Sequence, residues 1–219
     1  FNDIAQCQAN WIPSLMQFAR AITNRFAADG RGYVFLPNLG GLVTGWDPTD
    51  YAVGHGGMIE CFALWGGDNY FDVADWQLQM DRALALVRSN KIVLCQSYTD
   101  TSNYRDRMFA TASHLLIKGS RTYFCLVTAG ALEYYPEYTL PLGAASSGPA
   151  AGIDALWNAS WGVYRRNFAN GFVLVNPGDS AANIASLGGT FFLATATGGG
   201  EVDDAGNYGG SLSYTPVSA

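Results

Sequence analysis

The carboxylate of Glu60 is the side chain in this sequence whose surroundings most favour chemistry. It lies in the run Met58-Ile-Glu-Cys-Phe62, in which every other residue is apolar. A charge in such a run is costly to bury without a partner, so a carboxylate there indicates either a functional role or a structural partner. One hypothesis is an acid, base or nucleophile of a hydrolytic site. The alternative is a structural glutamate paired with an arginine or an amide.

Further polar and aromatic side chains follow the predicted strands at the points where those strands end. Asn38, Gln96 and Tyr98 can hydrogen-bond the hydroxyl groups of a ligand such as a sugar. Aromatic rings can stack on sugar faces, and an acid beyond the last strand can line the same edge. These additional candidates are Trp46, Trp65, Glu133 and Tyr134. The alternatives are core or lid packing for the rings and a solvated loop position for Glu133.

Several other chemistries are disfavoured because their motifs are missing. The sequence has no Gly-x-Ser-x-Gly elbow, no P-loop, no dinucleotide fingerprint and no His-Glu-x-x-His. His55 and His114 are isolated, and the four cysteines show no Cys-x-x-Cys spacing. We therefore predict no metal site and no cofactor. A cation held by Asp203 and Asp204 stays open beside the simpler interpretation, a solvated turn.

Three of the cysteines lie in apolar, strand-like runs. Cys61, Cys95 and Cys125 are therefore expected to be reduced and structural. A different interpretation takes the chain as complete, as an open α/β sheet in which one of these thiols is a nucleophile. It is disfavoured because no histidine is placed to activate a thiol.

The elements that must position the candidate residues alternate between amphipathic helices and apolar strands. A first helix has an apolar face between Ile12 and Phe26, with Pro13 in its first turn. Two further helices are expected at about 72–89 and 101–118. Short apolar runs near 33–38, 57–64, 91–97 and 121–127 predict buried parallel strands that helices cover. The carboxyl ends of such strands lie along one edge of the sheet.

The character of the chain changes after about residue 130. We expect βα units over 1–130, a loop-rich connection over 131–160 and a small antiparallel β region over 161–219. In the last part, Asn170-Gly171 between two apolar runs predicts a hairpin. This β region is expected to pack on the first part or to continue it.

Composition narrows the class of protein and its partners. The chain has 219 residues, is 49% hydrophobic and carries a net charge of −6. This composition excludes a disordered chain, and an acidic chain with two lysines argues against nucleic acid as a partner. No apolar run approaches the length of a membrane-spanning helix, so no membrane span is expected.

Three stretches resemble parts of glycoside hydrolase-like TIM-barrel proteins. Trp161-Gly-Val-Tyr-Arg-Arg-Asn-Phe-Ala-Asn-Gly-Phe-Val-Leu-Val-Asn-Pro177 resembles the strand pair that follows the last barrel strand. Gly57-Met-Ile-Glu-Cys-Phe62 resembles the barrel strand that ends in an acid, and Tyr33-Val-Phe-Leu-Pro-Asn38 resembles the strand before it. The resemblance extends from about residue 10 to 215.

The resemblance implies an α/β fold that is the second half of a (βα)8 barrel, followed by a small antiparallel β region. The chain would then be a fragment whose first half belongs to the same polypeptide or to a partner chain, and an oligomer is possible. Glu60 would be one catalytic carboxyl group, and the second would come from the absent half. The substrate would be an extracellular polysaccharide or oligosaccharide, and the protein would be secreted or bound to the cell surface.

A non-catalytic alternative keeps the same fold. In that interpretation the protein is a carbohydrate-binding or structural surface protein, and Glu60 does not act in hydrolysis.

Overall fold

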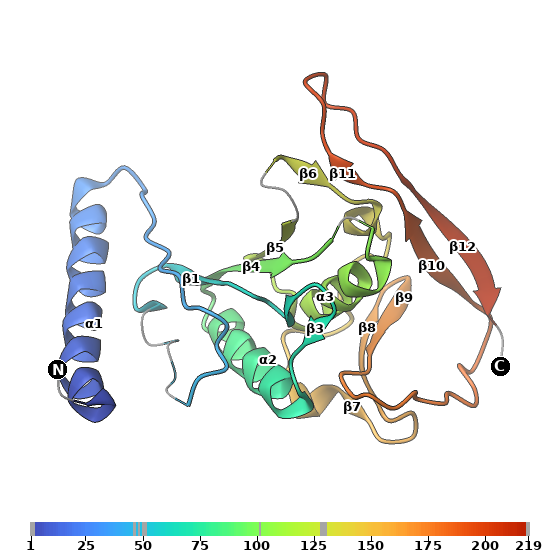
Figure 1. Ribbon diagram of the computed structural model, residues 1–219, viewed down its shortest axis with the longest axis horizontal. Helices are drawn as coiled ribbons and strands as arrows, with labels where there is room; N and C mark the ends of the chain where they lie inside the picture. Colours follow the sequence, from blue (N-terminus) through green and yellow to red (C-terminus); the bar gives the residue numbers. More distant parts are fainter. Residues whose placement is uncertain are drawn as a thin grey trace.

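A parallel sheet at the centre of the molecule holds the segments that carry the candidate residues (Figure 1). The computed structural model describes residues 3–45, 47, 49, 52–100, 102–127 and 131–217. The central sheet consists of β1 (Gly56–Ile59), β4 (Ile92–Tyr98) and β5 (Thr122–Val127), in that order. All of its pairings are parallel, which confirms that the apolar runs near 91–97 and 121–127 are parallel strands.

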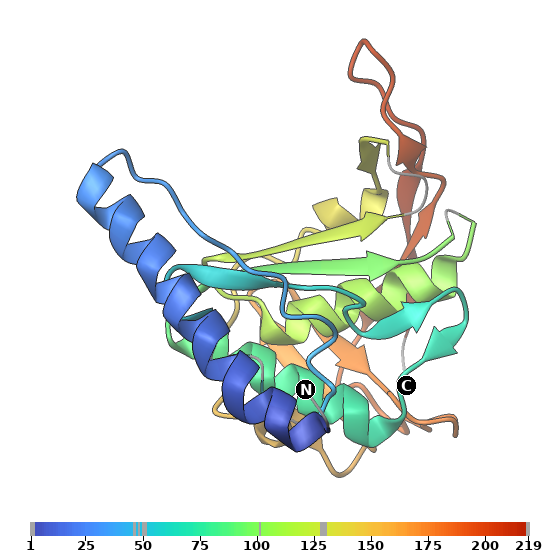
Figure 2. The same ribbon diagram turned by 60° about the vertical axis from the view of Figure 1, so that its left-hand side comes forward.

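Two amphipathic helices cover one face of this sheet. Helices α2 (Val73–Arg88) and α3 (Tyr104–Ile117) lie on the same side of β4 and β5 (Figure 2). Asp72 caps α2 by accepting from the backbone N–H of Asp75 at 2.8 Å, and Asn103 caps α3 in the same way. The buried core between these layers includes Trp76, Leu84, Phe62 and Leu116. Both helices agree with the predicted ranges.

The opposite face of the sheet is only partly covered. Along β4 the side chains alternate between buried and half-buried, and the half-buried set includes Leu94, Gln96 and Tyr98. On β5, Tyr123 pairs with Leu94 in the register and is 57% exposed. The sheet therefore has a covered helical face and an open face.

Helix α1 (Ile4–Asp29) stands at one side of the molecule. Asp3 caps it by accepting from the backbone N–H of Gln6 at 2.7 Å, and Gly30 ends it with a φ of 72°. Pro13 therefore lies inside the helix, and its predicted place in the first turn is wrong because the cap lies further upstream. Thr23 packs against the backbone of Gly54, which anchors the helix to the loop before β1.

Two predicted strands are shorter in the structure. The run 33–38 contributes one isolated parallel bridge, between Asn38 and Met58. Pro37 has no backbone N–H to donate, and glycines follow at Gly40 and Gly41, so the pairing cannot extend. The predicted strand 57–64 ends at Ile59 because the backbone then turns through positive φ angles at Cys61 and Ala63. Its remainder becomes β2 (Leu64–Gly66), which pairs antiparallel with β3 (Asn69–Tyr70).

The C-terminal part is antiparallel, as predicted. β8 (Val163–Phe168) and β9 (Gly171–Val175) form the predicted hairpin, and β7 (Trp157–Asn158) extends its sheet. This sheet lies beyond the helices (Figure 2). The ring of Tyr164 on β8 packs 4.9 Å from that of Trp76 on α2. Arg166 from β8 caps α3, because its Nη1 donates to the carbonyls of Leu115, Leu116 and Lys118.

One of the remaining elements, in the connection 131–160, pairs with a strand near the C-terminus. β6 (Glu133–Tyr134) pairs with β11 (Gly200–Glu201), and β10 (Phe191–Thr197) pairs with β12 (Ser211–Val217) in a protruding hairpin. Short 3-10 helices cover 136–139 (Pro136–Thr139) and 153–156 (Ile153–Leu156).

The observed fold is thus mixed α/β. Over the described residues it has three α-helices, a three-stranded parallel sheet and several antiparallel sheets, and the parallel sheet does not close into a barrel. The half-barrel stays a prediction. In the same part of the chain, no helix has the length and apolar character needed to cross a membrane.

Candidate functional site

The carboxylate of Glu60 lies at the carboxyl end of β1 and is held by two side chains from neighbouring segments. Its Oε2 accepts from Asn38 Nδ2 at 2.8 Å, and its Oε1 accepts from the hydroxyl of Tyr98 at 2.6 Å. Gln96 Nε2 in turn donates to the Tyr98 hydroxyl at 2.9 Å. We call Asn38, Glu60, Gln96 and Tyr98 the polar cluster. The amide of Asn38 against Glu60 is the contact that the structural interpretation of this glutamate expected.

Strand register explains why these four side chains meet. Asn38 bridges to Met58, and Ile59 pairs with Cys95, so Glu60 follows β1 beside Gln96 of β4. In β4 the residues that alternate with Gln96 and Tyr98 are buried under the helices, so these two side chains belong to the open face. The cluster therefore occupies the carboxyl end of the open face of the sheet.

Hydrogen bonding sets the protonation states in the polar cluster. The hydroxyl of Tyr98 and the amide of Asn38 both donate to the carboxylate, which lowers the pKa of Glu60 from its ordinary value. The hydrogen bond to Glu60 raises the pKa of Tyr98 to about 12. At neutral pH Glu60 is therefore an ionised carboxylate beside a neutral phenol. This state suits a nucleophile, a base or an electrostatic stabiliser rather than a proton donor.

A buried glutamine that the sequence analysis missed fixes the backbone around Glu60. Gln79 lies on α2 and is fully buried. Its Oε1 accepts from the backbone N–H of Ala63 at 2.6 Å, and its Nε2 donates to the carbonyls of Gly41 at 2.6 Å and Cys61 at 3.1 Å. It thereby ties the turn after Glu60 to the loop after Asn38. The available signal was an amide on the apolar face of the helix, three residues after Trp76.

The other predicted site residues do not join the polar cluster in the described structure. Trp65 is 44% exposed on β2, with its ring edge-on to Phe71 at 4.5 Å. Glu133 and Tyr134 form β6, where the ring of Tyr134 lies 4.2 Å from that of Tyr208. The predicted stacking residue Trp46 lies outside the described residues.

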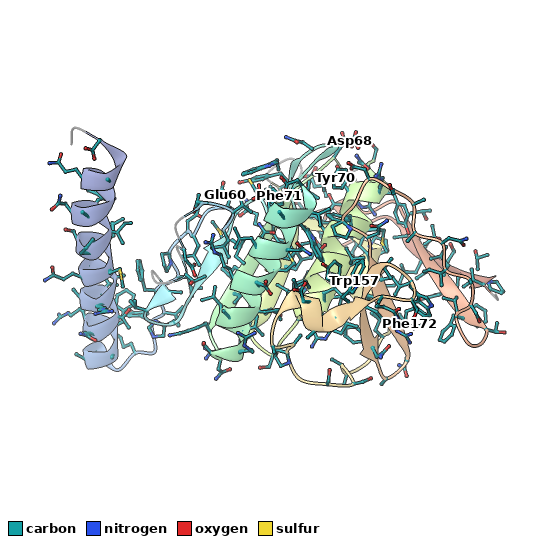
Figure 3. All side chains as sticks on the ribbon, turned by 90° about the horizontal axis from the view of Figure 1, so that it is seen from below. Glu60, Asp68, Tyr70, Phe71, Trp157 and Phe172 are labelled. Carbon is teal, nitrogen blue, oxygen red and sulfur yellow. The ribbon has the colours of Figure 1, made fainter. Side chains whose placement is uncertain are left out.

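Other acids near the strand ends have structural partners. Asp68, on the same side of the molecule as Glu60 (Figure 3), accepts from Asn103 Nδ2 at 3.0 Å. The buried Asp106 accepts from the backbone N–H of Asp68 and from the hydroxyl of Tyr70. Glu137 forms a buried ion pair with Arg107 at 2.7 Å. Within the described residues, Glu60 is thus the one carboxylate of the polar cluster.

The comparison with protein families identifies the class. The model of hypothetical glycosyl hydrolase family 15 matches residues 1–172. The chain belongs to this family. The predicted resemblance to glycoside hydrolase-like proteins is therefore confirmed. Among curated proteins, no sequence matches the chain.

In this member of hypothetical glycosyl hydrolase family 15, the matched range contains the polar cluster and the elements that position it. The match ends within β9, so the β10–β12 hairpin lies beyond it.

Thiol chemistry is a poor fit to this site. Cys61, Cys95 and Cys125 are free, as expected from their apolar surroundings. Burial raises the pKa of each of these thiols. A raised pKa reduces the thiolate fraction at neutral pH, which disfavours the cysteine-nucleophile interpretation. The described residues contain no group of three or more His, Cys, Asp or Glu side chains arranged to hold a metal ion.

Proposed function

We propose that this chain is part of a glycoside hydrolase that acts on an extracellular or cell-surface polysaccharide, with Glu60 as its carboxylate nucleophile or base. The observation that carries this proposal is the ionised Glu60 carboxylate, held by Asn38 and Tyr98 at the carboxyl ends of parallel strands. Glycoside hydrolysis uses two carboxyl groups, one of which must be ionised at the start of the reaction. Membership of a glycosyl hydrolase family supports the reaction class.

The proposed scaffold is the second half of a (βα)8 barrel. The segment at Asn38 and strands β1, β4 and β5 lie side by side in sequence order and are all parallel. A parallel sheet is usually covered on both faces, whereas this one is open on the face that carries Glu60. In a closed barrel this face would be the interior, and the polar cluster would lie at its catalytic end.

The second carboxyl group of the proposed mechanism comes from the other half of the barrel, in the same polypeptide or in a partner chain. It would protonate the glycosidic oxygen while Glu60 attacks the anomeric carbon or activates a water. Trp65, half-exposed near the same edge, is proposed to stack on a sugar ring.

The test is Glu60→Gln in the full-length protein, measured as sugar release from a panel of polysaccharides. We expect the rate to fall by about 10³-fold, because the amide removes the reactive charge while keeping the shape of the side chain. Glu201→Gln is the matched control, since Glu201 is exposed on β11 and lies outside the polar cluster, and it should retain activity. Unchanged turnover in Glu60→Gln would refute the proposal.

A carbohydrate-binding protein without catalysis is the second candidate. It is favoured by one observation: both oxygens of Glu60 already accept hydrogen bonds from the chain itself. In that case the wild-type protein would bind oligosaccharides without releasing sugar, and Trp65→Ala would weaken binding.

A further inference from the structure

A second polar site lies at the opposite edge of the parallel sheet from Glu60. A cavity of about 770 Å³ is lined by the residues that precede β4 and β5, by the ends of α2 and α3 and by the loop 143–149. Its cationic side chains are Arg88, Lys91, Lys118, Arg121 and Arg166. None of the described residues that line it is Asp or Glu.

This concentration of positive charge is unusual for the chain. Five of its 12 lysines and arginines line the one cavity, including both of its lysines, although the net charge of the chain is −6. The ion pairs of the described residues involve Arg31, Arg82 and Arg107, and none of the cavity cations. The cavity therefore concentrates cations that have no carboxylate counter-ion in the described structure.

The hydrogen-bond partners of four of these five cations are neutral carbonyl oxygens. Arg88 Nη1 donates to the carbonyls of Ala150 and Ala151, and Lys91 Nζ donates to that of Gly54 at 2.6 Å and to that of Val53 at 3.3 Å. Arg121 Nη1 donates to the carbonyl of Asn90 at 3.2 Å, and Arg166 Nη1 to three carbonyls at the end of α3. These bonds orient the head groups but leave their charge uncompensated.

The helix dipoles compensate only a small part of this positive charge. The carboxyl ends of α2 and α3 meet the cavity, and each contributes about half a negative charge, about −1 in total against five cations. Burial and the charges of Lys118 and Arg166 lower the pKa of His114 to about 3.

The loop 143–149 leaves the cavity open. It is made of small residues, and Ser147 and Ser120 bring hydroxyl groups to the lining. No bulky side chain from this loop fills the space between the cations. Cations with fixed head groups, hydroxyl donors and an open volume are the components of an oxyanion site.

We propose that this cavity binds a phosphate- or sulfate-class oxyanion, either free or attached to a sugar. The site is separate from the polar cluster, because it lies at the amino ends of the strands whose carboxyl ends carry Glu60. A bound oxyanion would compensate the excess positive charge and join the ends of α2 and α3 to the loop 143–149.

The test is calorimetric titration of the full-length protein with inorganic phosphate, inorganic sulfate, glucose 6-phosphate and glucose at low ionic strength. We expect one saturable site for the three anions, none for glucose, and weaker binding as sodium chloride is added. Tighter binding of glucose 6-phosphate than of phosphate would identify a phosphorylated sugar as the ligand, and equal binding would identify the free ion. No saturable binding in the millimolar range would overturn the proposal.

Charge-matched variants locate the site. Lys118→Ala and Arg121→Ala should each weaken phosphate binding about tenfold, the loss expected for one charge-assisted hydrogen bond. Arg20→Ala and Arg25→Ala remove the same charge from exposed positions of α1 and should leave the affinity unchanged. An equal loss in all four variants would mean a general charge effect and would refute the assigned site. Retained circular dichroism and thermal unfolding show that each variant is folded.

Discussion

The hydroxyl of Tyr98 donates to Glu60 Oε1 at 2.6 Å, across the boundary between two neighbouring parallel strands. This contact links the protonation of the carboxylate to a residue that lies 38 positions away in the chain. It also receives support from Gln96, whose amide donates to the same hydroxyl. The lowered pKa of Glu60 therefore depends in part on the pairing of β1 with β4, which brings Tyr98 beside the carboxylate.

Removal of this hydroxyl should raise the pKa of Glu60. In Tyr98→Phe the ionised carboxylate loses its main donor, so we expect the pKa of Glu60 to rise toward its ordinary value. The acid limb of any Glu60-dependent activity should move to higher pH by the same amount. The carbon-13 chemical shift of the Glu60 carboxyl group, followed against pH, measures the pKa without a substrate.

Tyr123→Phe is the control for this titration, because Tyr123 is an exposed tyrosine of the same face on β5. It should leave the titration of Glu60 unchanged. An unshifted Glu60 titration in Tyr98→Phe would show that the hydrogen bond does not govern the carboxylate.

The buried amide of Gln79 should contribute substantially to the free energy of unfolding. Gln79→Leu leaves the N–H of Ala63 and the carbonyls of Gly41 and Cys61 without their partner, which we expect to cost about 3 kcal/mol of unfolding free energy. Urea unfolding measures this loss. If Gln79 also positions Glu60, the carboxyl chemical shift of Glu60 should change in the folded variant.

The matched control is Gln77→Leu on the same helix. Gln77 makes one side-chain hydrogen bond, from Nε2 to the hydroxyl of Tyr164 at 2.5 Å, so its replacement should cost about 1 kcal/mol. Equal losses in the two variants would contradict a special role for Gln79.

The sequence was informative about the polar cluster because each of its members lies at or near the end of a predicted parallel strand. Asn38, Gln96 and Tyr98 were predicted to be site residues from their positions at strand ends, and parallel pairing brings those ends to one edge. The side chains of β4 alternate between the two faces of the sheet, which a strand pattern also predicts. Gln79 was missed because an amide on an apolar helix face does not reveal which backbone groups it will meet.

Long-range pairing explains the candidates that fall elsewhere. Glu133 and Tyr134 follow β5 in sequence, but they pair with β11 from the tail, and the ring of Tyr134 packs on that of Tyr208. The paired residues Tyr134 and Gly200 are 66 positions apart, and antiparallel pairing over such a separation is set by tertiary structure and leaves no local signal. The shortening of the run 33–38 to a bridge has a local cause instead, because Pro37 has no backbone N–H to donate to a ladder.

The charges of Arg107 and Glu137, which form a buried ion pair, should contribute to stability in a strongly coupled way. The guanidinium meets the carboxylate through two hydrogen bonds, of 2.7 and 2.9 Å, and both side chains are almost completely buried. Arg107→Met leaves a buried carboxylate without its cation, which we expect to cost about 3–5 kcal/mol. The loss is read from the urea midpoint and slope.

The double variant Arg107→Met with Glu137→Met tests the coupling. It removes both charges, so its unfolding free energy should exceed that of Arg107→Met alone. A loss of unfolding free energy in the double variant that equals the sum of the losses in the two single variants would show that the two charges are not coupled.

The start of β1 has no room for a side chain at Gly56. A Cβ built there would lie 1.8 Å from the carbonyl oxygen of Ile92, and the φ of 154° also disfavours other residues. Gly56→Ala should therefore separate β1 from β4 and cost more than about 4 kcal/mol of unfolding free energy, among the largest effects of single substitutions. Because Glu60 follows β1, its hydrogen bond to Tyr98 should be lost as well, and the pKa of Glu60 should rise. Gly209→Ala is the control, since a Cβ at Gly209 would meet no atom within 4 Å. Equal stability of the two variants in urea, or an unchanged Glu60 titration in folded Gly56→Ala, would contradict the dependence of the polar cluster on the β1–β4 pairing.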